Sequence, residues 1–171
     1  MQAVIIILRS THIVLGVFWA GTALFLNTLL APSLAAAGPA GGRVMQELGQ
    51  RRFHDVLGLV STLTILSGAS LLWLDSGGFA RAWVLAPMGM GFCIGCLAAI
   101  AACLVGLLAV RPLVVRMDQM HGELMEARTE ALRGSHSGRL GIMREQVTYR
   151  SRWIAWFLGV AVLAMAVARY L

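Results

Sequence analysis

The sequence predicts an all-α polytopic membrane protein, a bundle of four transmembrane helices with a cytoplasmic helical hairpin between the third and the fourth. Of its 171 residues, 58% are hydrophobic and only 13% are charged, about half the charged share of a soluble domain. Four apolar stretches approach the ~20 residues that a helix needs to cross a bilayer. This composition excludes a typical soluble enzyme, a disordered chain and a disulfide-stapled secreted module.

The four expected spans cover residues 3–30, 56–74, 83–110 and 153–168, within one membrane domain of residues 1–171. None alternates as a barrel strand would, and lipid admits only helices or closed barrels. The first stretch lacks a positively charged start and is too long for a cleaved signal peptide, so we expect a retained span.

The arginines predict the orientation. All 14 basic residues are arginine, and the net charge is +6. Because 11 of them lie in the two long connecting segments, the positive-inside rule places these segments in the cytoplasm and both termini outside a bacterial inner membrane. The arginines flank apolar runs rather than forming one soluble patch, so no nucleic-acid partner is expected. The three on the other side are Arg9, Arg81 and Arg169.

The segment between the last two spans, about residues 112–152, is expected to be a helical extension. A heptad-like spacing runs through Met117, Met120, Leu124, Ala127 and Ala131. Residues 134–138, Gly-Ser-His-Ser-Gly, are expected to break the helix, which resumes from Ile142. Two arrangements remain open: a hairpin that projects below the membrane, and an amphipathic helix that lies along the inner leaflet.

His12 is the leading candidate for a functional residue. It lies inside the first span, where an ionisable group is costly and usually functional. Helical spacing places Gly16, Trp19 and Ala23 below it on the same face, and Arg9 one turn above. An axial imidazole with arginine above for a propionate suits haem b. The alternative is a histidine that is hydrogen-bonded to a neighbouring helix.

The residues expected at the depth of His12 offer a second ligand of a different kind. Histidine–methionine ligation and five-coordinate iron are both compatible with them. Arg81, in the connection on the outer side, is expected to join Arg9 at the propionates. The facing residues are Met88 and Met90 on the third span, Met165 on the fourth, and Ser67 and Gly68, which offer no strong ligand, on the second.

The remaining histidines are expected elsewhere. His54 begins the second span at its inner end, roughly 20 Å in height from His12. The two should therefore not ligate one iron, and His54 is interpreted as an interfacial residue. His121 and His136 fall in the cytoplasmic segment and are expected to be solvated.

The third span carries a stripe of small residues at every fourth position, typical of helix packing. The stripe is Gly91, Gly95, Ala99 and Cys103. The three cysteines all lie in this span and form no disulfide framework. Soft sulfur ligands could instead hold Cu(I), which gives an alternative copper site of Met88, Met90, Cys93 and Cys96.

A family resemblance adds to this reading. His12-x6-Trp19-x-Gly21, in a first helix ending at Ala31-Pro32, resembles the bacterial copper-resistance D, HemJ and urate-oxidase membrane-domain group. The stretch Arg51-Arg52-Phe53, leading into a helix with Ser67-Gly68 and Trp73, is similar to that group's second helix. The resemblance covers roughly residues 5–112. The resemblance implies that His12 binds haem. HemJ-like members have a lysine or histidine in the third helix, whereas the corresponding residues of this sequence, 88–91, are Met-Gly-Met-Gly.

The expected function is therefore a b-type haem membrane protein for electron transfer or porphyrin-linked redox chemistry. Its expected partners are the lipid bilayer, a redox partner or quinone, and a homo-oligomer or larger membrane complex. The alternatives are a copper-handling membrane protein and a cofactor-free accessory subunit. No catalytic residue is assigned. No span carries an internal carboxylate relay, which disfavours a proton-coupled transporter.

Overall fold

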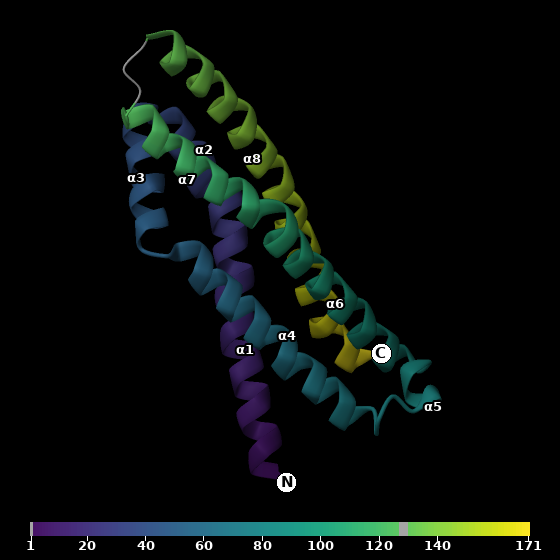
Figure 1. The fold of residues 1–171 in the computed structure, drawn as a ribbon. Coiled ribbons are helices and arrows are strands. Elements are labelled where there is room, and N and C mark those ends of the chain that lie inside the picture. The colour runs from purple at the N-terminus through teal and green to yellow at the C-terminus, as the bar shows by residue number, and fades with distance from the viewer. Residues whose placement is uncertain (1, 127–129) are drawn as a thin grey trace.

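A computed structural model describes residues 2–126 and 130–171, and these fold as a bundle of long helices (Figure 1). Both termini lie at one end of the bundle, which we call the terminal end. The opposite end, the hairpin end, carries the tips of the two connecting segments. The elements in chain order are α1 Gln2–Phe25, η1 Leu26–Leu30, α2 Ala31–Ala36, α3 Pro39–Gln50, α4 Phe53–Asp75, α5 Arg81–Val84, α6 Pro87–Leu104, η2 Val105–Val110, α7 Arg111–Glu126, α8 Glu130–Val167 and η3 Ala168–Tyr170.

Four of the described helical stretches are long and apolar enough to cross a membrane, as the sequence predicts. They are Gln2–Ala36, Phe53–Asp75, Pro87–Met120 and Gly138–Ala168. The third begins at Pro87 rather than at residue 83, because Pro87 occupies the first turn of α6 and the residues before it form the separate helix α5. Proline suits that position, where its missing N–H has no helical partner.

Two prolines lie inside continuous helices, which corrects the expectation that the first helix ends at Ala31-Pro32. The helix continues to Ala36 through the π-helical segment η1, and η2 likewise precedes Pro112. A proline ring clashes with the carbonyl four residues earlier, and the wider π turn relieves that clash. Side chains then bond nearby carbonyls, as Thr28 does with Leu24 O at 2.7 Å.

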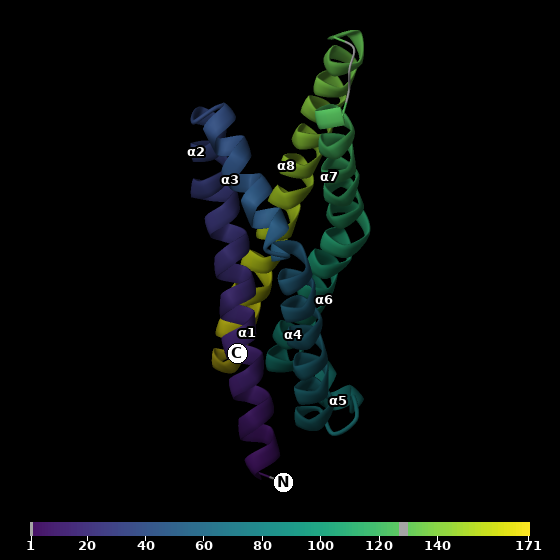
Figure 2. The same ribbon diagram turned by 60° about the vertical axis from the view of Figure 1, so that its left-hand side comes forward.

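The segment before the last span is a hairpin of two helices packed side by side, α7 and α8 (Figure 2). The expected break at residues 134–138 is wrong, because α8 is helical from Glu130 onward. The low helix propensity of glycine and serine is a weak preference, which the surrounding structure can override. Ala127 of the expected heptad and Arg128 lie outside the described residues. At 1.5 Å per residue, the 38 residues of α8 extend about 57 Å, well beyond the ~30 Å of a hydrocarbon core.

The small-residue stripe of α6 is a packing surface, as predicted, and its residues Gly91 and Gly95 pack against the last span. A β-carbon added at Gly91 would lie 2.8 Å from Ala168 Cβ, and one at Gly95 would lie 2.7 Å from Met165 Cγ. The outward faces of the spans are apolar, with Val17, Leu66, Leu97 and Leu163 all more than half exposed. Small residues therefore bring α6 and α8 together, and large apolar ones cover the outside, as in a bundle surrounded by lipid.

The packed centre of the bundle lies midway between its ends. Trp19 and Ala20 of α1 meet Ala102 and Cys103 of α6 and Leu158 of α8 there, all buried. This layer separates two cavities, one toward each end.

Candidate functional site

The larger cavity opens toward the terminal end and has a volume of about 500 Å3. It lies among α1, α4, α6 and α8, and it falls in the ~300–1,000 Å3 range of small-molecule pockets. Its walls are mostly apolar. The polar or polarisable groups among its lining residues include His12, Thr64, Trp19, Cys96 and Met165.

His12 lies in this cavity with one ring nitrogen engaged. Nδ1 lies 2.9 Å from the carbonyl oxygen of Thr64 and 3.4 Å from Ser67 Oγ. Because a carbonyl can only accept, Nδ1 carries a proton, and in the neutral imidazole Nε2 then keeps its lone pair. Metal-binding histidines show the same pattern, in which a backbone carbonyl fixes the tautomer and the ring plane.

Gly68 gives the imidazole its place against α4. A β-carbon on Gly68 would lie 2.6 Å from His12 Cε1 and 3.0 Å from Nδ1, so only glycine admits the ring there. The sequence-based depth estimate, which put Ser67 and Gly68 level with His12, is confirmed. Gly16 also lines the cavity, but a β-carbon there would meet Thr64 Cγ2 at an ordinary 3.6 Å.

Charged residues form the rim of the large cavity. Arg9 Nη2 lies 3.2 Å from Asp75 Oδ2, and both side chains are 42% exposed. Arg169 also lines the cavity, whereas the expected Arg81 is exposed at the start of α5 and is not a lining residue. Two arginines and one aspartate leave this rim with an excess positive charge.

The structure does not bring the expected methionine ligands of the third span to the cavity. Met88 and Met90 are 38% and 46% exposed and do not line the cavity. Gly91 packs against Ala168, so the residues on either side of that packed face of α6 turn outward. Met165, on the fourth span, does line the cavity.

The cysteines do not act as one group. Cys96 lines the large cavity, Cys103 lies in the packed centre, and all three cysteines are free. Within the part of the chain that the structure describes, no group of three His, Cys, Asp or Glu side chains could hold a metal ion. The copper site expected from Met88, Met90, Cys93 and Cys96 is therefore not assembled, because both methionines face outward.

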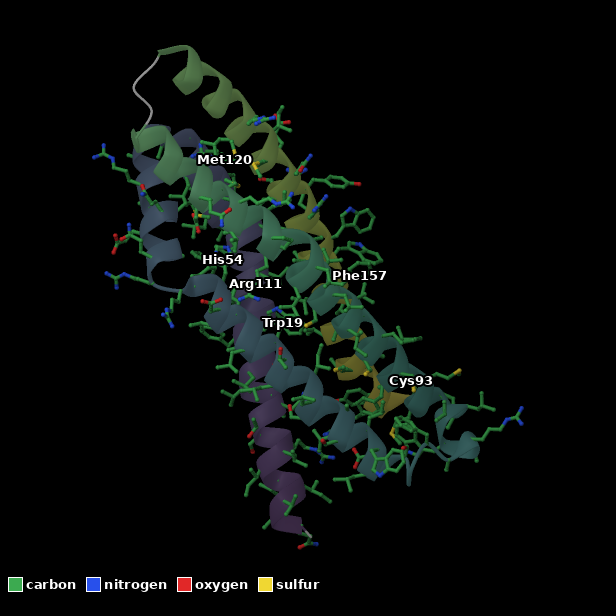
Figure 3. All side chains as sticks on the ribbon, viewed as in Figure 1. Trp19, His54, Cys93, Arg111, Met120 and Phe157 are labelled. Atoms are coloured by element: carbon green, nitrogen blue, oxygen red, sulfur yellow. The ribbon has the colours of Figure 1, made fainter. Side chains whose placement is uncertain are left out.

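The smaller cavity, of about 120 Å3, lies toward the hairpin end. Trp19, His54 and Arg111 line it, and Figure 3 shows them in the same part of the bundle, away from Cys93. His54 precedes Thr64 and Gly68 by 10 and 14 residues on α4, or about 15–21 Å along the axis. The geometry thus keeps His54 and His12 apart, as the depth argument predicts.

Sequence reasoning missed Asp75, Arg169 and the small cavity. The charges had a signal in the sequence, because Asp75 ends the second span and Arg9 lies in the outer part of the first. The small cavity had no signal in the sequence, because it arises from the packing of four separate segments.

Comparisons with family models, with curated proteins and with solved structures find no match for this chain.

Proposed function

We propose that this protein is an integral membrane protein that binds haem b in its large cavity, with His12 as an axial ligand. The observation that carries the proposal is the hydrogen bond of 2.9 Å from His12 Nδ1 to Thr64 O. It leaves the Nε2 lone pair free inside a cavity of about 500 Å3. The same bond is the one expected of a histidine that is only hydrogen-bonded to a neighbouring helix, and the adjoining cavity is what favours a ligand.

The residues around His12 fit this group. Apolar walls suit a porphyrin face, and the rim arginines Arg9 and Arg169 suit its propionates. Trp19 and Gly16 line the wall on α1, the helix that carries His12. When bound, haem b supplies one-electron chemistry at its iron. This chain's residues would hold the ring, fix its height and neutralise its carboxylates.

We place the protein in a bacterial inner membrane, with both termini outside and the α7–α8 hairpin in the cytoplasm. The arginine distribution supports this orientation, because the hairpin end carries most of the arginines. The haem would then lie near the outer leaflet, where it could exchange electrons with a redox protein or a membrane quinone.

A copper-binding function is a second candidate, on a ligand set different from the one in the sequence. His12, Cys96 and Met165 line the same cavity, and imidazole, thiolate and thioether together suit Cu(I). This candidate predicts copper without a porphyrin spectrum.

The absorption spectrum and the metal content of the purified protein separate the candidates, if the cells have ample haem and copper. We expect a Soret band and iron at one haem per chain. Bound copper that is lost in Cys96→Ala and in Met165→Leu would favour the second candidate. Finding neither iron nor copper would overturn both candidate functions and favour a cofactor-free accessory subunit.

A further inference from the structure

Some polar residues around the small cavity have no hydrogen-bond partner among the residues that the structure describes. Trp19, which lines both cavities, is 5% exposed, and its indole N–H has no acceptor among the residues that the structure describes. The Ser151 hydroxyl and the His54 imidazole line the same cavity, and neither has a hydrogen bond to any described residue. A buried indole N–H is almost always paired, with protein or with ordered water. His54 and Ser151 are half-buried, and water can reach them more easily.

The cavity is large enough for water, and several polar groups lie in its otherwise apolar wall. Its volume of about 120 Å3 corresponds to about four waters at the ~30 Å3 that each occupies in the liquid. Ser61, which bonds Gly58 O at 2.9 Å and accepts from Cys103 Sγ at 3.7 Å, adds a hydroxyl to the wall. The Asn27 amide, which bonds Ala23 O at 2.8 Å, adds a carbonyl oxygen.

An exposed ion pair lies at the edge of this cavity, toward the hairpin end. Arg111 Nη2 pairs with Asp55 Oδ1 at 3.1 Å, and both side chains are 56% exposed. Arg111 itself lines the cavity, so a solvated ion pair lies at its mouth. At the inner end of the small cavity lies Trp19, which lines both cavities and belongs to the packed centre between them.

We propose that the small cavity is a water-filled vestibule, open at the hairpin end and closed by Trp19, that brings water and protons from that side into the middle of the bundle. Water would accept from the Trp19 N–H and bridge Ser151 and His54. Histidines that line water-filled cavities inside membranes are typical of proton pathways. This inference is independent of the ligand in the large cavity.

Silver ion, a soft probe of ionised thiols and small enough for this cavity, tests the proposal. A chain with Cys93→Ala and Cys96→Ala keeps Cys103 as its single thiol. The matched control adds Cys103→Ala and Leu104→Cys, which places a thiol at almost the same height on the outward face, where Leu104 is 50% exposed. Silver is added to either side of sealed vesicles, and the remaining thiol is counted after denaturation.

We expect silver to block Cys103 at least tenfold faster from the hairpin side than from the terminal side, and at least tenfold faster than the Leu104→Cys thiol. Equal rates for Cys103 and the control would mean a dry cavity. Faster blocking from the terminal side would mean that Trp19 does not close it. Either result overturns the proposal.

A second measurement needs no cysteine variant. The indole N–H of Trp19, assigned in an NMR spectrum by its loss in Trp19→Phe, should exchange with D2O added to the wild-type protein in minutes. Protection over hours, as for an N–H packed in a dry core, would overturn the proposal.

Discussion

At the scale of single residues, Gly68 determines where the ring of His12 can lie. It carries no side chain, yet the ring of His12 occupies the space where its β-carbon would lie. The hydrogen bond to Thr64 O needs that ring position. The position of His12, and with it the haem-binding role that we propose, therefore depends on a residue with no functional group.

The variant Gly68→Ala should displace His12 and lower haem content at least tenfold. Overpacking of this kind costs about 1–3 kcal/mol, and the better helix propensity of alanine returns up to ~1 kcal/mol. The Soret absorbance per chain measures the haem. The control is Gly58→Ala on the same helix, whose β-carbon would meet Leu107 Cδ2 at an ordinary 3.7 Å. Equal losses in both variants would contradict the role of Gly68.

In the proposed haem complex, Asp75 would compete with a propionate for Arg9. The variant Asp75→Asn should release the Arg9 guanidinium to a propionate and slow the transfer of haem to a soluble haem scavenger. Arg169→Gln should speed that transfer, because it removes the other rim cation. The free energy of unfolding should change by less than ~1 kcal/mol in Asp75→Asn, because the Arg9–Asp75 pair is half exposed. Faster transfer from Asp75→Asn would show that the ion pair itself holds the haem.

The depth of a residue in the bundle could be predicted from the sequence, but the direction in which its side chain faces could not. Counting 1.5 Å per residue placed His12 level with Ser67 and Gly68, and the structure agrees. The same counting chose Met88 and Met90, which turn outward. Rotation about a helix axis depends on what each face packs against, and for α6 that is the Gly91 contact with Ala168.

At the scale of elements, the contact between α6 and α8 holds the third and fourth spans together. The variant Gly91→Leu should lower the free energy of unfolding by about 2 kcal/mol, because its side chain would meet Ala168. The midpoint of unfolding of this variant in mixed micelles, compared with that of the wild-type protein, measures this loss. Gly159→Leu is the control, since a β-carbon there has no other atom within 4 Å. A similar loss in the control would indicate a propensity effect rather than packing.

Prolines show where element boundaries escape sequence reasoning. Pro87 begins a helix, whereas Pro32 and Pro112 continue one through a π-helical segment. The residue type is the same, and the outcome depends on whether the preceding carbonyls find other donors. Arg150 supplies one, since its Nη1 donates to Ala109 O at 2.8 Å. Such a partner, 41 residues away, has no local signal in the sequence.

At the scale of the whole molecule, the orientation prediction can be tested with thiols in a cysteine-free background. Gly138→Cys lies in the exposed part of α8 toward the hairpin end, and Ala80→Cys is exposed before α5. In intact cells, with the outer membrane made permeable, an impermeant maleimide should label only Ala80→Cys. Labelling of Gly138→Cys alone would reverse the orientation and move the haem site to the cytoplasmic side.

The four spans and their order follow from composition, because lipid demands long apolar helices and few alternatives exist. The two cavities do not, since each is a gap left by side chains from several helices. Trp19 illustrates the difference. Its place on the His12 face was predictable from helical spacing, whereas its position between the cavities depends on Ala102, Cys103 and Leu158 of other helices.

The most direct test of the central claim is the haem content of His12→Gly, with and without free imidazole. Removing the side chain leaves a space that imidazole can fill as an external ligand, while His54→Gly serves as the control in the small cavity. We predict that His12→Gly loses the Soret band, that imidazole restores it, and that His54→Gly keeps it. A Soret band that survives in His12→Gly and disappears in His54→Gly would contradict the assignment of the haem to His12 and the large cavity.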